Sequence, residues 1–89
     1  MKTLINEFWR EIPPRYHKYF PGMIKGEYEE DRSWINFKVT SKKKATSKDA
    51  EQFQTDFGKH PAGYGFYSFK EKKDGKNYIY TWNCSRSSD

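Results

Sequence analysis

The clearest pattern in the chain is an alternation of apolar and polar residues across Ser33–Ser41. Apolar residues at odd-numbered positions face one way and mostly polar residues at even-numbered positions face the other: Ile35, Phe37 and Val39 against Trp34, Asn36, Lys38 and Thr40. Side chains alternate between the two faces of a strand, so this pattern predicts a strand with one packed and one solvated face. Met23–Glu30 is expected to pair with it through a tight turn at Glu30-Asp31-Arg32.

Two segments have helical spacing instead. Thr3–Ile12 carries Leu4, Ile5, Phe8 and Ile12 on one stripe, and Pro13-Pro14 would end a helix there. The second segment begins with Thr46 and Asp49, which have the spacing of a capping box. Ala50, Phe53 and Phe57 then share a helical face, and Gly58 suits a left-handed C-cap.

Tyr64–Lys72 and Lys76–Cys84 are expected to form a second hairpin, because Asp74-Gly75 is a strong turn signal. The chain is therefore predicted to be one α+β domain over residues 1–89, with a frayed tail from Ser85 to Asp89. The expected architecture is a two-layer sandwich in the order α-β-β-α-β-β. It has an antiparallel sheet of about four strands with two short helices on one face.

The composition limits the classes of function and partner that we expect for this chain. The 89 residues carry a formal charge of +5 and are 19% aromatic, so the core must depend on rings and some rings should stay exposed. A basic surface favours nucleic acid or an acidic protein surface. The single cysteine, Cys84, excludes an internal disulfide and favours a reducing cytoplasmic location. With only two histidines there is no ordinary zinc set, and no cofactor or membrane span is indicated.

The stretch from Gly63 to Phe69 alternates glycines with rings. It resembles the aromatic strand motif of RNA-recognition-motif and cold-shock domains, and that resemblance implies bases stacked on a sheet face. We expect five rings on this strand and the next to be candidate contacts: Tyr64, Phe66, Tyr78, Tyr80 and Trp82. The alternative is that these rings simply build the core, since glycines in strands often mark close packing.

Basic residues gather in two further places. Lys42, Lys43 and Lys44 precede the N-terminus of the second predicted helix, where main-chain amides attract phosphate, and Lys59 and Lys70 would extend that rim. Arg15 and Lys18 lie among aromatic residues and suit a phosphate or a protein interface. The alternative is that all of these are ordinary solvated side chains.

No catalytic set is evident, because nothing brings His60 and Cys84 together, so we expect a non-catalytic binding module. The first hypothesis is binding of single-stranded nucleic acid or RNA through sheet aromatics and a lysine rim. The second is a small phage-type inhibitor, similar to anti-CRISPR proteins, that blocks a host protein or nucleoprotein complex through exposed tyrosine and tryptophan. The sequence indicates neither the identity of the partner nor an oligomeric state.

Overall fold

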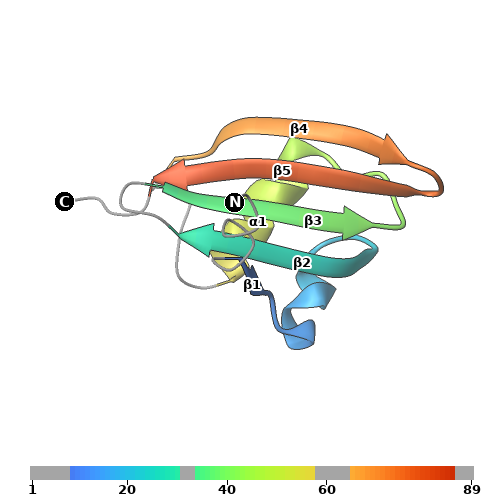
Figure 1. Cartoon of the computed structure of the whole chain (residues 1–89), viewed down its shortest axis with the longest axis horizontal. Helices are drawn as coiled ribbons and strands as arrows, with labels where there is room; N and C mark the ends of the chain where they lie inside the picture. The colour runs from blue at the N-terminus through green and yellow to red at the C-terminus, as the bar shows by residue number, and fades with distance from the viewer. Residues whose placement is uncertain (1–8, 31–33, 58–64, 86–89) are drawn as a thin grey trace, which may run out of the picture.

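The computed structural model describes residues 9–30, 34–57 and 65–85 (Figure 1). Five strands, one α-helix and one 3₁₀ helix follow one another along the chain. They are β1 (Arg10–Glu11), η2 (Pro14–Tyr19), β2 (Met23–Glu30), β3 (Trp34–Ser41), α1 (Ser47–Asp56), β4 (Tyr67–Asp74) and β5 (Asn77–Ser85).

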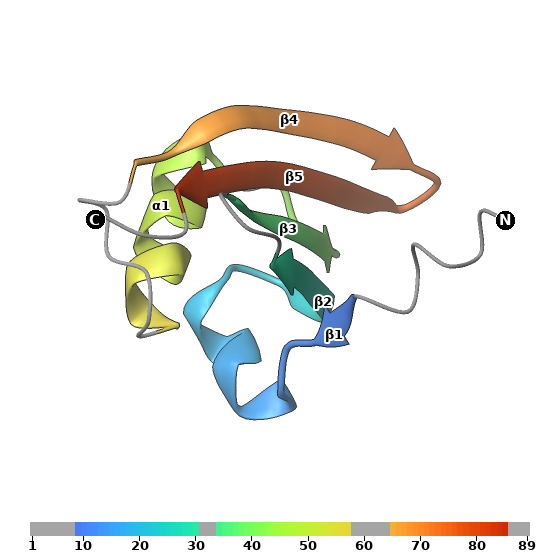
Figure 2. The ribbon, with the colours of Figure 1, turned by 60° about the vertical axis from the view of Figure 1, so that its left-hand side comes forward.

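The strands form a single antiparallel sheet in the order β1-β2-β3-β5-β4. Strand β5 lies between β3 and β4, so these two outer neighbours run parallel to each other, and α1 connects them across one face of the sheet. Helix η2 lies on the same side as α1, as Figure 2 shows, and its Tyr16 ring contacts Phe57 at the end of α1. The sheet therefore has one covered face and one open face, on which none of the described helices lies.

Both predicted hairpins are confirmed, and β2 has the predicted bounds. Gly75 adopts the positive φ (+64°) that the tight β4–β5 turn requires. The prediction of four strands is wrong by one, because β1 adds a short fifth strand.

The predicted helix over Thr3–Ile12 is wrong at its C-terminal end, where Arg10–Glu11 forms β1; residues 3–8 lie outside the described residues. The main-chain N–H of Ile12 donates to Gly26 O at 2.8 Å, so this segment bonds to the edge of β2 rather than to itself. Gly26 also leaves room for the Ile12 side chain, since a Cβ at Gly26 would lie 3.0 Å from Ile12 Cδ1. The second helical element is instead η2, which begins after Pro13.

The capping box at the start of α1 is confirmed. Thr46 Oγ1 accepts from the Asp49 N–H at 3.2 Å, and the Asp49 carboxylate accepts from the Thr46 N–H at 2.9 Å. These bonds satisfy two of the amides that an isolated helix end leaves free, and they fix where α1 starts. Gly58, the expected C-cap residue, lies outside the described residues.

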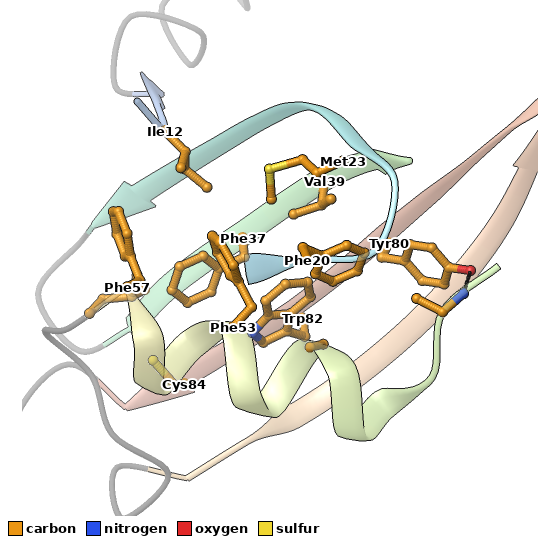
Figure 3. Close-up of a cluster of buried hydrophobic side chains, with 13 residues drawn as sticks. Ile12, Phe20, Met23, Phe37, Val39, Phe53, Phe57, Tyr80, Trp82 and Cys84 are labelled. Atoms are coloured by element: carbon orange, nitrogen blue, oxygen red, sulfur yellow. Dashed lines mark hydrogen bonds between the residues drawn. The ribbon is translucent and has the colours of Figure 1, made fainter. Parts of the chain in front are cut away.

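The core lies between the sheet and the two helical elements, and it is built mainly from rings (Figure 3). Phe37 stacks on Trp82 with ring centroids 5.0 Å apart, and Phe53 meets the same indole edge-on from α1. The Trp82 Nε1–H donates to Gln54 Oε1 at 3.2 Å, which pairs the one polar group of this indole. Among the described residues, no helix is long and apolar enough to cross a membrane.

Candidate functional site

The aromatic residues of β5 lie on the covered face. Tyr80 is 0% exposed and Trp82 is 2% exposed, and both pack against Phe20. Phe66 is half-buried against Trp82, and Tyr64 lies outside the described residues. The hypothesis that Tyr80 and Trp82 stack with a partner is therefore wrong, because a base cannot reach a ring that α1 and η2 cover. The alternative, that these rings build the core, is the one the burial supports.

Tyr80 has a structural role at the end of the sheet. Its hydroxyl accepts from the Ala45 N–H at 2.7 Å and donates to Glu71 Oε2 at 2.7 Å, while Lys44 Nζ donates to both oxygens of Glu71 at 2.9 and 3.0 Å. Burial raises the pKa of Tyr80 to about 12. The hydrogen bonds from Lys44 and then from Tyr80 lower the pKa of Glu71. Together these contacts hold the β3–α1 loop against β4.

This network changes the interpretation of Lys42, Lys43 and Lys44. Lys44 forms a salt bridge with Glu71 and lies over the half-buried Tyr78 ring at 5.8 Å, so its charge is already engaged. Lys42 and Lys43 are exposed on the loop. The predicted phosphate site at the helix N-terminus would compete with the Asp49 carboxylate, which already bonds there and repels a second anion.

The remaining predicted basic residues are not brought together. Arg15 and Lys18 belong to η2, where each cation lies over the neighbouring ring, Tyr16 at 4.8 Å and Tyr19 at 5.5 Å. Lys70 is on β4, with its Cα opposite Thr81 of β5, and faces the open side of the sheet. Lys59 lies outside the described residues. Of the predicted site residues that the structure describes, Lys70 is the one that belongs to the open face.

The open face consists of alternate residues on the strands β2, β3, β5 and β4. The prediction that the even-numbered side chains of β3 face away from the core is confirmed, since Ile35, Phe37 and Val39 are buried. Cross-strand pairing sets the open-face residues in rows: Asn36–Asn83–Tyr67, Lys38–Thr81–Lys70 and Thr40–Ile79–Lys72, with Trp34 opposite Ser85 at one end.

A β-bulge in β4 places Tyr67 on this face. Tyr67 pairs with Asn83 and Lys70 with Thr81, so three steps along β4 match two steps along β5. The extra residue, Ser68, has φ +59°, which an L-residue with a side chain seldom adopts. Because of the bulge, Phe66 and Phe69 both point to the core while Tyr67 points away from it. Bulges that re-aim a side chain are common beside functional sites.

Trp34 and Tyr67 form an exposed aromatic pair. Their ring centroids lie 5.7 Å apart at an interplanar angle of 89°, and the two residues are 42% and 49% exposed. Sequence reasoning placed Trp34 on the outer side of β3 but did not select it as a contact residue. Tyr67 could not be assigned to this face, because regular alternation in β4 points it to the core.

Charges on the open face are segregated. Lys38, Lys70 and Lys72 surround β5, whereas β2 contributes Glu27 opposite Lys38 and Glu29 opposite Asn36. Glu27 lies 3.6 Å from Lys25 Nζ in an exposed ion pair. The open face therefore has a basic part over β3, β5 and β4 and a border along β2 where Lys25 pairs with Glu27 and Glu29 adds a second carboxylate. Amide and hydroxyl groups lie between these charges.

Burial raises the pKa of the Cys84 thiol to about 11, so the thiol stays protonated at neutral pH and is a poor nucleophile. No group of three or more potential metal ligands occurs within the described ranges. What the open face can do is stack a planar group, pair with an anion and form hydrogen bonds.

Comparison with known proteins adds no further guide: no family model matches the chain, and no curated protein or solved structure shows significant similarity to it. The function must therefore be inferred from the geometry of the open face.

Proposed function

We propose that this protein is a non-catalytic module that binds single-stranded nucleic acid on the open face of its sheet. The observation that carries the proposal is the exposed Trp34–Tyr67 pair on the same face as three lysines. A strained bulge at Ser68 is needed to keep Tyr67 outside the core. A bulge of this kind is costly, which supports a functional reason for it.

The chemistry of the face suits unpaired bases. A base stacked on an aromatic side chain contributes about 1–3 kcal/mol to binding, whatever its identity. Lysines within reach of the same rings can neutralise the phosphates that join successive bases. Asn36 and Asn83 are cross-strand partners in the same row as Tyr67, where their amides can bond to base edges. A duplex hides its bases in the stack, so exposed rings on an open sheet face favour a single strand.

A second candidate is a protein-binding inhibitor of the phage type, and the border along β2 favours it. Glu27 and Glu29 adjoin the basic part of the face, which gives a mixed-charge surface. Trp34 and Tyr67 are also the residue types that most often dominate protein interfaces. On this account the open face contacts a protein of complementary charge, and nucleic acid binds weakly or not at all.

The proposal is tested by fluorescence anisotropy with a labelled oligonucleotide of mixed sequence, offered as single-stranded RNA, single-stranded DNA and duplex, at about 50 and about 200 mM salt. We expect the single strands to bind more tightly than the duplex and to weaken at the higher salt. The double variant Trp34→Ala/Tyr67→Ala should weaken binding about tenfold or more, since each stacked base contributes about 1–3 kcal/mol. Tyr19→Ala is the matched control, because Tyr19 is 40% exposed but belongs to η2.

Two results would overturn the proposal. One is the absence of binding to every oligonucleotide at low salt. The other is binding that Tyr19→Ala weakens as much as the open-face double variant does, because the contact would then lie elsewhere.

A further inference from the structure

The open face is hollowed along β5. Two adjoining depressions of about 300 and about 360 Å³ follow this strand, and both are lined by Lys70 and Thr81. Trp9, Asn36 and Asn83 line the first of them, nearer the aromatic pair, and Lys38, Lys72 and Ile79 line the second. Both volumes are near the lower limit for small-molecule sites, so the trough suits an extended chain better than a compact ligand.

The rows across the trough have a regular spacing. Successive open-face residues of one strand are two positions apart, which corresponds to about 6.7 Å. This is comparable with the separation of neighbouring phosphates in an extended single strand. Lys38 and Lys70 flank Thr81 from both sides, about 10 Å apart at their Cα atoms, so both side chains can reach one group above Thr81. Lys72 stands beside Ile79 one row further on.

The trough has a border of the opposite charge. Glu27 of β2 is the Cα partner of Lys38, and Glu29 is the Cα partner of Asn36. A polyanion that crossed the sheet from β4 toward β2 would meet both carboxylates, whereas one that ran along β5 would meet neither. The charges therefore favour one direction of binding, parallel to the strands.

We infer, on the basis of the proposed function, that the open face holds a segment of three nucleotides lying along β5. One base stacks on the Trp34–Tyr67 pair, the next phosphate lies between Lys38 and Lys70, and the following phosphate lies at Lys72. Glu27 and Glu29 confine the strand to this lane. The trough therefore defines both the length and the direction of the binding site.

The length of the site is tested by titrating the full chain with single-stranded oligonucleotides from a dinucleotide to a hexanucleotide. Affinity should rise clearly from the dinucleotide to the trinucleotide and then increase only as the number of equivalent registers grows. Two phosphate contacts predict a slope of about −1.4 for log K against log salt, at about −0.7 per contact for single strands. A steady gain in affinity with every added nucleotide would overturn the inference.

Variants with matched changes of charge test whether the nucleic acid lies parallel to β5. Lys72→Ala and the double variant Lys38→Ala/Lys70→Ala should each reduce the magnitude of the salt slope by about 0.7, since each removes one phosphate contact, and Lys38→Ala alone should reduce it by less. Lys42→Ala, on the β3–α1 loop, should leave the slope unchanged. Glu27→Gln should tighten binding severalfold, and Glu51→Gln on α1, which changes the net charge equally, should not.

The failures of the two proposals are distinguishable. If no hexanucleotide binds at low salt, the proposed function itself is wrong. If oligonucleotides bind and Trp34→Ala weakens them, but Lys38→Ala has no more effect than Lys42→Ala, the function stands and the lane along β5 is wrong.

Discussion

Both faces of the sheet carry tryptophan and tyrosine, but these rings are buried on one face and exposed on the other. The covered face holds Phe37, Tyr80 and Trp82 beneath α1 and η2, with the Trp82 indole N–H bonded to Gln54. The open face holds Trp34 and Tyr67, which contact each other and remain more than two-fifths exposed. Whether a ring on this sheet is buried or exposed therefore depends on its strand position and not on its residue type.

Polar groups show the same contrast. On the covered side Lys44, Glu71 and Tyr80 are bonded to one another within the molecule. On the open side the lysines surround a trough and the amides face outward. The covered face packs against the two helical elements, whereas the open face presents charged and amide groups to solvent.

The largest expected difference is between the two tryptophans. Trp82→Ala should lower the free energy of unfolding by about 3–5 kcal/mol, because it empties the centre of the core. Trp34→Ala should lower it by less, because the Trp34 ring is 42% exposed while that of Trp82 is 2% exposed. Urea denaturation followed by circular dichroism measures both values. Equal losses would mean that Trp34 is a core residue and the contrast between the faces is false.

Tyr80→Phe removes one hydroxyl from the covered face. We expect a loss of about 1–3 kcal/mol, because the buried Ala45 N–H loses its acceptor. The folded protein holds the Tyr80 proton with a pKa of about 12, above the ordinary value of 10.0. This contribution to stability is therefore complete below about pH 10 and is lost as the pH rises toward 12.

Denaturation at pH 8, 10 and 11 checks this dependence. The wild type should lose stability between pH 10 and 11 more steeply than Tyr80→Phe does. Parallel curves for the two proteins would show that Tyr80 is not held neutral by its burial.

Ser68→Gly tests the cost of keeping Tyr67 on the open face. Glycine adopts a positive φ without strain, so this variant should gain up to about 1 kcal/mol. Ser85→Gly is the control, because Ser85 has ordinary strand geometry, and glycine there should lose about 0.5–1 kcal/mol. Oligonucleotide binding by Ser68→Gly should match the wild type. A loss of stability in Ser68→Gly would mean that Ser68 stores no strain.

The smallest effect is expected at the exposed Lys44–Glu71 pair. The hydrogen bond from Lys44 lowers the pKa of Glu71 in the folded state, so the pair stabilises the protein above the ordinary value of 4.5. That contribution disappears as the pH falls through the lowered pKa. Thermal melts between pH 6 and pH 3 should show less acid destabilisation in Glu71→Gln and in Lys44→Ala than in the wild type. An unchanged acid profile in both variants would contradict the role given to this pair.

Local patterns predicted most of the elements. The alternation of apolar and polar residues predicted β3, and the Asp74-Gly75 turn signal predicted the second hairpin. The spacing of Thr46 and Asp49 predicted where α1 starts. The N-terminal segment failed because helical spacing at Ile12 is equally compatible with an edge strand whose apolar residue fills the space above Gly26. Which of these forms depends on a contact some fourteen residues away, which periodicity does not contain.

The proposed binding surface was harder to predict than the fold. The aromatic motif in β4 and β5 was found, but its glycine-rich appearance does not show which face α1 will cover. The bulge at Ser68 then inverts the alternation upstream of it, so Phe66 turns inward and Tyr67 outward. A serine carries no sequence signal for such a bulge. The polar side of β3 was the available clue, because it sets Trp34 and Lys38 on the solvated face.

The most direct test of the central claim is a ¹H–¹⁵N NMR titration of the full chain with a single-stranded trinucleotide, which also detects weak binding. We expect the resonances of the Trp34 indole N–H and of the Asn36 and Asn83 side-chain amides to shift, while that of the Trp82 indole N–H, bonded to Gln54, stays in place. Shifts confined to Arg15, Lys18 and their neighbours on η2, or no shifts at all, would contradict binding at the open face.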